Sequence, residues 1–261
     1  MTETAFLIRD DADGIATVTL NRPEARNSLS QGMLQALLAA LESLAADENI
    51  RVVVLAGTGP AFCAGHDLKE LRAAQYERAY TETLFANCAK VMQAIVHLPK
   101  PVIAQVHGVA TAAGCQLVAS CDLALAADNA RFATPGVNIG LFCSTPMVAL
   151  SRNVGHKAAM QMLLTGDMID AETALRFGLI NEIVPPADLA AATRALALKI
   201  ASKSPLTLAI GKEAFYRQAE LTLADAYAYT AQVMATNLET QDAREGIDAF
   251  LDKRPAAWCG R

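Results

Sequence analysis

The chain has 261 residues, which fits one large domain or one domain with a short appendage. Hydrophobic residues make up 53% and charged residues 19% of it, so we expect a sizeable core and little disorder. The formal net charge of −5 argues against a general binder of nucleic acid or anionic membranes, because both need a basic surface. The six cysteines show neither a CxxC pair nor zinc-ligand spacing, which indicates reduced thiols and no metal site.

The N-terminal third is predicted to contain strands and one amphipathic helix. Residues 5–10 and 14–20 are typical of two strands around a DADG turn, and ATVTL alternates apolar and polar residues. Ser30 is a candidate N-cap for a helix whose leucines recur at helical spacing from Leu34 to Leu44. Residues 51–57, RVVVLAG, predict a buried strand.

The middle of the chain alternates helix and strand. Residues 77–97 predict a helix that ends before Pro99. The long apolar stretch 101–127 contains polar residues and glycines, so we expect buried structure rather than a membrane span. Within it we predict a strand, a short helix and a strand, at 101–106, 113–120 and 122–127. Strands separated by helices imply parallel pairing through crossover connections.

After about residue 144 the pattern becomes helical, and only NEIV (181–184) suggests a strand. The predicted helices are 155–164, 170–177, 188–202, 204–217, 221–236 and 240–252. We therefore expect a β/α core over residues 1–195 and a helical oligomerisation region over 196–261. The apolar faces of the last helices need a partner, either in the same subunit or in a neighbour.

Two small-residue loops are candidates for a binding site. AFCAGHDLKE (61–70) follows a buried strand, and its backbone N–H groups can face a ligand; an ordinary loop with Asp67 as a helix cap is the alternative. HGVATAAGCQL (107–117) also follows a strand, and it leads into a helix near Ala113; tight helix packing is the alternative. One amide donor from each loop would make an oxyanion hole.

Several segments in order resemble the crotonase (enoyl-CoA hydratase/isomerase) superfamily. They are NRPEARNSLS, VVVLAGTGPAFCAGHDLKE, KPVIAQVHGVATAAGCQLVASCDLALAAD, TPGVNIGLF, LLTGDMIDAETALRFGLINEIVP and REGIDAFLDKR. The resemblance covers essentially the whole chain, and TPGVNIGLFCSTP and AAGCQLVASCD are most similar to the branch called enoyl-CoA hydratase domain-containing protein 3. It implies an α/β, ClpP/crotonase-like fold of repeated ββα units with a helical C-terminal trimerisation region. It also implies a homo-trimer, or a hexamer made of two trimers.

The resemblance also implies site residues and a ligand, an acyl-CoA thioester with no cofactor beyond its CoA moiety. The oxyanion amides would belong to His66 and Ala113, with Gly114 beside them in the catalytic loop. The CoA-binding residues carried over by position are Arg26, Ala64, His66, Asp67, Leu68, Lys69, and, from a neighbouring subunit, Phe250 and Lys253. For Arg26 and Lys253, solvated surface charge is the alternative.

This chain departs from a typical hydratase at both positions where the family carries a catalytic glutamate. Gln116 and Gly136 stand there, and neither side chain can accept or deliver a proton. Positioned acid–base catalysis contributes roughly 10²–10⁴-fold, so we expect classical hydration to be weak or absent. His66 is the best candidate for a replacement acid or base, although it need contribute only its amide. Cys115 and Cys143 are more typical of buried thiols than of nucleophiles.

Two functions from different classes remain open at this point. One is a lyase-class enzyme of the hydratase/isomerase type in fatty acid metabolism. The other is a non-catalytic protein that binds acyl-CoA or a protein partner. The N-terminal MTETAFLIRDD has neither an apolar signal core nor the composition of a transit peptide, so we expect a cytoplasmic location.

Overall fold

A six-stranded sheet organises the computed structural model, which describes residues 5–261. The strand order is β1-β2-β3-β4-β6-β9, and every neighbouring pair is parallel except β1 with β2. The strands are β1 (Leu7–Ala12), β2 (Ile15–Leu20), β3 (Val52–Gly57), β4 (Val102–Val106), β6 (Leu123–Ala127) and β9 (Glu182–Val184). The predicted parallel pairing is confirmed.

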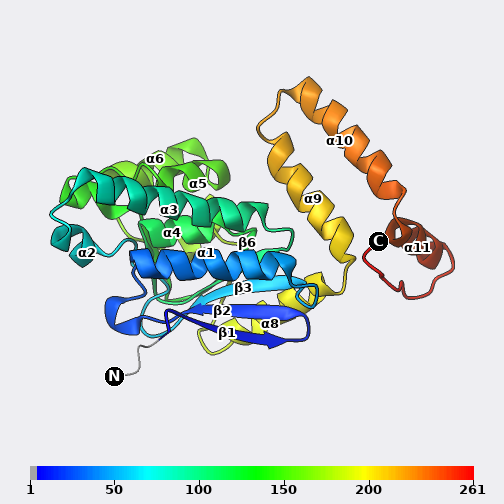
Figure 1. Ribbon diagram of the computed structural model, residues 1–261, viewed down its shortest axis with the longest axis horizontal. Coiled ribbons are helices and arrows are strands. Elements are labelled where there is room, and N and C mark those ends of the chain that lie inside the picture. The colour runs from blue at the N-terminus through cyan, green and yellow to red at the C-terminus, as the bar shows by residue number, and fades with distance from the viewer. Residues whose placement is uncertain (1–4) are drawn as a thin grey trace.

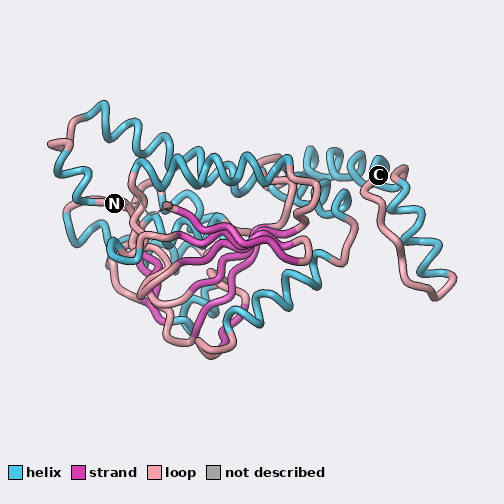
Figure 2. Tube along the Cα trace, turned by 60° about the horizontal axis from the view of Figure 1, so that its bottom comes forward, coloured by secondary structure: helices cyan, strands magenta, loops and turns pink. Residues whose placement is uncertain are grey.

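Helices cover both faces of this sheet (Figure 1; Figure 2). One face packs against helices α1, α3 and α4, and the other against α8. These helices are α1 (Gln31–Ala46), α3 (Arg78–His97), α4 (Ala113–Ser120) and α8 (Leu189–Ala201). Burial on both faces explains why β3 is apolar throughout: Val53 and Leu55 join the first core, whereas Val52 and Val54 join the second.

The start of α1 illustrates how the sequence specifies its elements. The side chain of Ser30 accepts a hydrogen bond from the amide of Met33, which confirms the predicted N-cap. The leucines that follow at helical spacing face the core, with Leu34 and Leu37 almost fully buried. The capping residue therefore determines where the helix begins, and its apolar residues determine which face packs against the core.

A second, three-stranded sheet lies beside the first and was not predicted. Its order is β5-β7-β8, made of β5 (Val109–Thr111), β7 (Arg131–Ala133) and β8 (Ile169–Asp170). These strands have three residues or fewer, so they show no hydrophobic period of their own. Their pairing is fixed by tertiary contacts, and β5 leads directly into α4.

Shorter helices lie between the longer elements along the chain. They are η1 (Pro23–Ala25), α2 (Leu68–Ala73), η2 (Pro135–Ile139), α5 (Pro146–Asn153), α6 (His156–Thr165) and α7 (Ala171–Phe177). Helix α5 was not predicted, whereas α6 and α7 fall within a residue of the expected ranges. Among residues 5–261, no helix is both long and apolar enough to cross a membrane.

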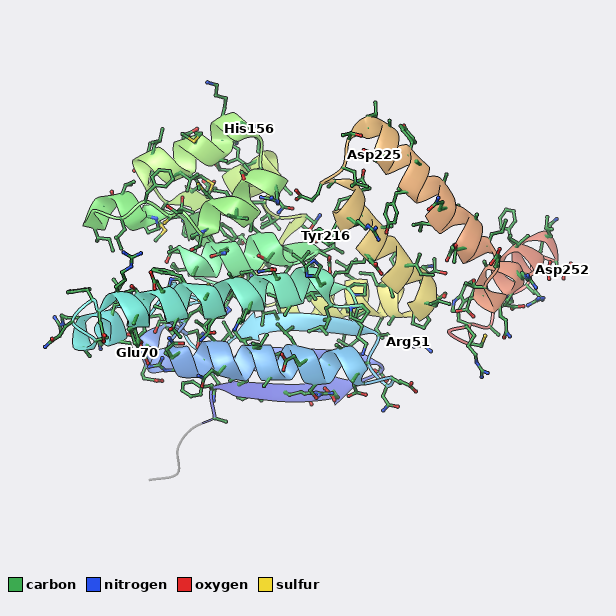
Figure 3. All side chains as sticks on the ribbon, turned by 45° about the horizontal axis from the view of Figure 1, so that its top comes forward. Arg51, Glu70, His156, Tyr216, Asp225 and Asp252 are labelled. Atoms are coloured by element: carbon green, nitrogen blue, oxygen red, sulfur yellow. The ribbon has the colours of Figure 1, made fainter. Side chains whose placement is uncertain are left out.

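Three C-terminal helices form an arm that extends away from the β/α body (Figure 1). They are α9 (Pro205–Gln218), α10 (Leu223–Leu238) and α11 (Gln241–Leu251). The expected boundary between residues 195 and 196 falls inside α8, which packs on the sheet, so the arm begins only at Pro205. In Figure 3, Tyr216 lies on α9 beside the body, whereas Asp225 and Asp252 mark the outer helices.

A buried polar network attaches α9 to the body. Asp122 accepts hydrogen bonds from Lys212 Nζ at 2.7 Å, from the hydroxyl of Tyr216 at 2.9 Å and from the amide of Val102 at 2.7 Å. Lys212 also donates to the carbonyl of Ile95 at the end of α3. Asp122 is therefore a structural acceptor that ties the residue before β6 to the arm.

Candidate functional site

The two small-residue loops identified in the sequence run side by side. Cys63 pairs with Ala110 as an isolated parallel bridge. The amide of Thr111 donates to the carbonyl of Cys63 at 3.0 Å, and the amide of Cys63 donates to the carbonyl of Val109 at 3.1 Å. The loop before α2 is therefore held against β5 and the beginning of α4.

Two glycines allow this close approach. A Cβ atom on Gly65 would lie 2.9 Å from Ala112 Cβ and 3.4 Å from the backbone nitrogen of Ala113, and Gly65 has a φ of +92°. A Cβ on Gly114 would overlap the carbonyl of Cys63. Larger residues would force the two loops apart, so the small-residue pattern reflects backbone packing around Ala113.

The amides of His66 and Ala113 flank this contact. The parallel bridge between Leu29 and His66 uses the amides of Leu29 and Asp67, which leaves the N–H of His66 on the opposite side from Leu29. Ala113 is the first residue of α4, whose N-cap, Ala112, makes no side-chain capping bond. Within residues 5–261, neither amide donates a hydrogen bond to a protein acceptor. Both donors are thus free for a ligand.

The imidazole of His66 packs against α3. Its ring meets the ring of Phe85 edge-on, with centroids 5.2 Å apart and planes at 88°. Its Nε2 atom is buried and has no hydrogen-bond partner among the described residues. Burial lowers the pKa of His66 to about 4, so the ring is neutral near pH 7 and a weak base.

Gln116 lies one turn along α4 from Ala113 and is 4% exposed. Its Oε1 atom faces the thiol of Cys88 on α3 at 4.0 Å. Its Nε2 atom donates no hydrogen bond to the protein within residues 5–261. At this position the chain therefore presents a neutral amide with an unpaired donor.

Gly136 lies in η2, and its surroundings leave no room for a side chain. A Cβ at this position would lie 2.6 Å from the carbonyl oxygen of Leu141 and 2.9 Å from Cys143 Sγ. The amide of Gly136 donates to the same sulfur at 3.3 Å. The segment 141–143 thus fills the space into which a longer residue would project.

The thiols near the two loops are protonated in this environment. Burial raises the pKa of Cys63, Cys88 and Cys115 to about 12 and also raises the pKa of Cys143. All six cysteines are free thiols. In residues 5–261, no group of three or more His, Cys, Asp or Glu is placed to hold a metal ion. The buried cysteines fit structural positions better than nucleophilic ones.

Arg26 is brought beside the first loop by a strained turn. Arg26 and Asn27 both have positive φ, at 50° and 53°. The fully buried side chain of Asn27 accepts from the amide of Arg22 and donates to the carbonyls of Thr58 and Ala61, each at 2.8 Å. The carbonyl of Arg26 accepts from the amide of Ala64 at 3.0 Å, while its side chain is exposed.

The other residues expected to bind CoA lie in two separate places, at the start of α2 and around the end of α11. Asp67 caps α2 through the amide of Lys69 and pairs with Arg22 at 3.3 Å, so the capping interpretation is confirmed. Leu68 and Lys69 are exposed at the start of α2. Phe250 and Lys253 are exposed on α11 and just after it. Because α2 and α11 lie at opposite ends of the molecule (Figure 1), one chain does not bring these two groups together.

Three features of this site were not predicted from the sequence. Asn27 anchors the Arg26 turn, and its only sequence signal is its place in the NRPEARN segment. Thr134 precedes η2, is fully buried, and has an Oγ1 without a partner among the described residues. The contact of Cys88 with Gln116 joins α3 to α4 and carries no sequence signal.

Comparison with known proteins shows the family to which this chain is similar. Residues 10–261 match the family described as Enoyl-CoA hydratase/isomerase. The enoyl-CoA hydratase domain-containing protein 3 of Xenopus laevis is 48% identical over 98% of this chain and 86% of its own length. The human protein of the same name is 49% identical over 94% of this chain and 81% of its own length.

Solved structures show the same fold. A Mycobacterium smegmatis enoyl-CoA hydratase superposes with a TM-score of 0.94 at 54% identity, covering 97% of this chain and 98% of the other. The human enoyl-CoA hydratase domain-containing protein 3 also gives 0.94, at 48% identity, covering 97% and 100%. The expected crotonase fold, and the resemblance to this branch, are confirmed.

The expected cytoplasmic location is wrong by this comparison. The relatives from Xenopus laevis, mouse and human are all named as mitochondrial proteins, which contradicts that expectation. The expectation rested on the composition of MTETAFLIRDD, and the first residues of the chain as given are no guide to where the protein resides.

Proposed function

Because the chain belongs to the enoyl-CoA hydratase/isomerase family, we propose that it binds an acyl-CoA thioester and polarises its carbonyl group with the N–H groups of His66 and Ala113. The observation that carries this proposal is the contact between the two loops. Gly65 packs against Ala112 and Ala113, and both amides are free of protein partners within residues 5–261. Two preorganised amide donors stabilise the charge that develops on a thioester oxygen during enolate formation.

The proposal includes weak or absent hydration of double bonds. Gln116 and Gly136 occupy the positions assigned to the two hydratase glutamates, and the local structure fits neutral residues at both. Gln116 is buried against Cys88, and Gly136 is closed in by Leu141 and Cys143. His66, with its pKa lowered to about 4 by burial, is a weak substitute base near pH 7.

The same proposal includes how the CoA moiety is bound and why more than one subunit is needed to bind it. Arg26, Ala64 and the segment from His66 to Lys69 would bind CoA on one subunit, and Phe250 and Lys253 would reach it from a neighbour. The distance between α2 and α11 within one chain supports a contribution from a neighbour (Figure 1). So do the apolar side chains exposed on the arm, which include Phe215 at 65%, Leu223 at 77%, Tyr227 at 72% and Phe250 at 82%.

A non-catalytic acyl-CoA-binding protein is the second candidate. The crowding at Gly136 favours it, since Leu141 and Cys143 close the space that a second carboxylate would need. The free amides of His66 and Ala113 favour an enzyme, because a scaffold has no use for them. Both candidates predict binding of an acyl-CoA thioester, and they differ in turnover.

Two measurements on the purified protein separate the candidates. Loss of the conjugated thioester absorbance of crotonyl-CoA reports hydration, and titration with butyryl-CoA reports binding. We expect binding, with hydration roughly 10²–10⁴-fold below that of a family member with both carboxylates. Slow turnover that falls further in His66→Ala would support an unconventional enzyme, whereas binding without turnover across several acyl-CoAs would support the binder. Absence of binding to any CoA ester would refute the proposal.

A further inference from the structure

The guanidinium group of Arg22 contacts both chain segments of the parallel bridge between Leu29 and His66. On one segment, its Nη2 atom lies 3.3 Å from Oδ2 of Asp67, the residue after His66. On the other, its Nη1 atom donates to the carbonyl of Ser28, the residue before Leu29, at 3.5 Å. The hydroxyl of Ser28 donates to the same oxygen of Asp67 at 3.3 Å. Arg22 and its carboxylate partner therefore link the two segments beside the bridge.

The bridge sets the direction of the His66 amide. Leu29 donates to the carbonyl of Gly65 at 2.7 Å and accepts from the amide of Asp67 at 3.2 Å. The N–H and C=O groups of a trans peptide point in opposite directions, so the N–H of His66 points away from Leu29. The bridge is isolated rather than part of a ladder, so contacts on either side of it help to hold the segments in register. The direction of this amide therefore depends on the side chains that align the two segments.

Burial strengthens the pairing of Arg22 with Asp67. The two side chains are 23% and 9% exposed, and partly buried pairs are screened less by salt than surface pairs. The other carboxylate oxygen of Asp67 accepts from the amide of Lys69 at 3.0 Å, which ties the carboxylate to the start of α2. The guanidinium carbon of Arg22 lies 5.7 Å from the centre of the Phe6 ring. Both ends of the ion pair are thus held by further contacts, which favours a single geometry.

We infer that Arg22 is a positioning residue for the amide of His66, which it keeps directed at the thioester oxygen. It acts through Asp67 and Ser28, which hold the bridge in register. This role rests on the proposed polarisation of an acyl-CoA thioester. A hydrogen bond weakens steeply as its angle departs from linear, so a small displacement of the segment that carries His66 reduces what its amide contributes. Arg22 acts through the backbone and needs no contact with the ligand.

The absorbance spectrum of a bound chromophoric thioester, 4-(dimethylamino)cinnamoyl-CoA, tests this role. Hydrogen bonds to its carbonyl oxygen draw electrons from the amino group along the conjugated chain and move the absorbance to longer wavelength. The shift therefore reports polarisation separately from affinity. We expect a shift on binding to the wild-type protein, and a shift smaller by about half in Arg22→Met, because one of two donors is misdirected. Arg22→Lys keeps the charge that pairs with Asp67 and should give an intermediate shift.

Affinity for free CoA separates this role from a general effect on binding. Free CoA has no thioester carbonyl, so Arg22→Met should weaken its binding less than it weakens binding of the probe. Arg194→Met makes the same change in the exposed ion pair that Arg194 of α8 forms with Asp13. This control should leave both the shift and the two affinities intact.

Asp67→Asn gives a second route to the same test. Asparagine keeps the oxygen that caps α2 and removes the charge that pairs with Arg22, so we expect a similarly reduced shift. The double variant should lose no more than either single variant, because the two residues act as one unit. Circular dichroism shows whether each variant is folded, and Asp67→Asn carries the comparison if Arg22→Met does not fold.

The outcomes distinguish this role from the proposed function. A folded Arg22→Met protein whose bound probe keeps the wild-type shift would overturn the role and leave the proposed function standing, even if affinity for free CoA and for the probe falls equally. Losses of shift that add up in the double variant would also overturn it, because Arg22 and Asp67 would then act separately. A wild-type protein that binds the probe without any shift would instead overturn the proposed polarisation itself.

Discussion

A side chain at position 136 would collide with the thiol of Cys143. The Sγ atom lies 2.9 Å from the position of a Cβ on Gly136 and accepts the amide hydrogen of Gly136 at 3.3 Å. The carbonyl oxygen of Leu141 lies at 2.6 Å from the same Cβ position. The glycine and the segment 141–143 therefore depend on each other, and a glutamate at 136 requires that segment to move.

The first prediction concerns Gly136→Ala. One added methyl group meets a backbone oxygen that cannot rotate away, so we expect a loss of about 1–3 kcal/mol in the free energy of unfolding. Gly211→Ala is the matched control, because nothing lies within 4 Å of a Cβ there and alanine is favoured inside a helix. Urea denaturation compares the two. Equal stability of Gly136→Ala and the wild type would show that residues 141–143 yield freely.

A second prediction uses the buried ring of His66. Burial lowers its pKa from 6.5 to about 4, so the unfolded chain binds a proton on this residue between those values while the folded chain does not. Stability should therefore fall as the pH drops from about 6.5 towards 4, by an amount on the order of 3 kcal/mol, and this contribution should level off below pH 4.

Unfolding in urea at several pH values checks this dependence. His66→Leu cannot be protonated, so its stability should change less with pH over this interval. His156→Leu, at an exposed position, should retain the wild-type dependence. Parallel pH profiles for the wild type and His66→Leu would contradict the assignment of a neutral, buried ring.

The helices and strands that could be predicted from the sequence are those whose own pattern of apolar and capping residues shows which faces are buried and where they begin. The run Val52–Gly57 is apolar because both faces of β3 are covered, and α1 begins at a residue whose side chain caps it. Strands β5, β7 and β8 were missed because each has three residues or fewer and takes its register from partners distant in sequence. Short segments of this kind depend on tertiary contacts rather than on a period.

The candidate site also has features that the sequence predicts and features that it does not. The small residues of the two loops predicted that backbone amides could approach a ligand, with tight packing as the alternative. The structure shows tight packing at Gly65 and Gly114, where the two loops approach each other, and the approach to a ligand stays a prediction. Two side-chain contacts near these loops were not predictable, because His66 with Phe85 and Gly136 with Cys143 join residues that share no sequence pattern. The assignment of Gln116 and Gly136 to the two hydratase glutamate positions is a prediction from family resemblance, and residue spacing alone does not give it.

A third prediction tests Asn27 as the anchor of the Arg26 turn. Asn27→Asp keeps an acceptor for the amide of Arg22 and removes the donor to the carbonyls of Thr58 and Ala61. Leaving buried carbonyls unpaired beside a carboxylate should lower the free energy of unfolding by about 2–4 kcal/mol. CoA-ester affinity should fall as well, because Arg26 and Ala64 are held together by this turn.

The matched control for Asn27 is Asn49→Asp, at a surface position where the side chain bonds only to Asp47 among the described residues. It should change stability by less than about 1 kcal/mol. Denaturation and butyryl-CoA titration give the two readouts. A folded Asn27→Asp protein with unchanged stability and affinity would remove Asn27 from the account of this site.

The last prediction concerns the attachment of the arm. Asp122→Asn removes the charge that balances Lys212, whose side chain is 7% exposed, and weakens the bonds from Tyr216 and Val102. Removing one partner of a buried ion pair leaves the other charge uncompensated, so we expect a loss of about 3 kcal/mol in the free energy of unfolding. Glu220→Gln in the exposed Arg152–Glu220 pair should cost less than about 1 kcal/mol. Because α9 carries α10 and α11, Asp122→Asn should also weaken self-association in sedimentation measurements if the arm forms the oligomer contact. Similar losses in both variants would mean that Asp122 does not hold the arm to the body.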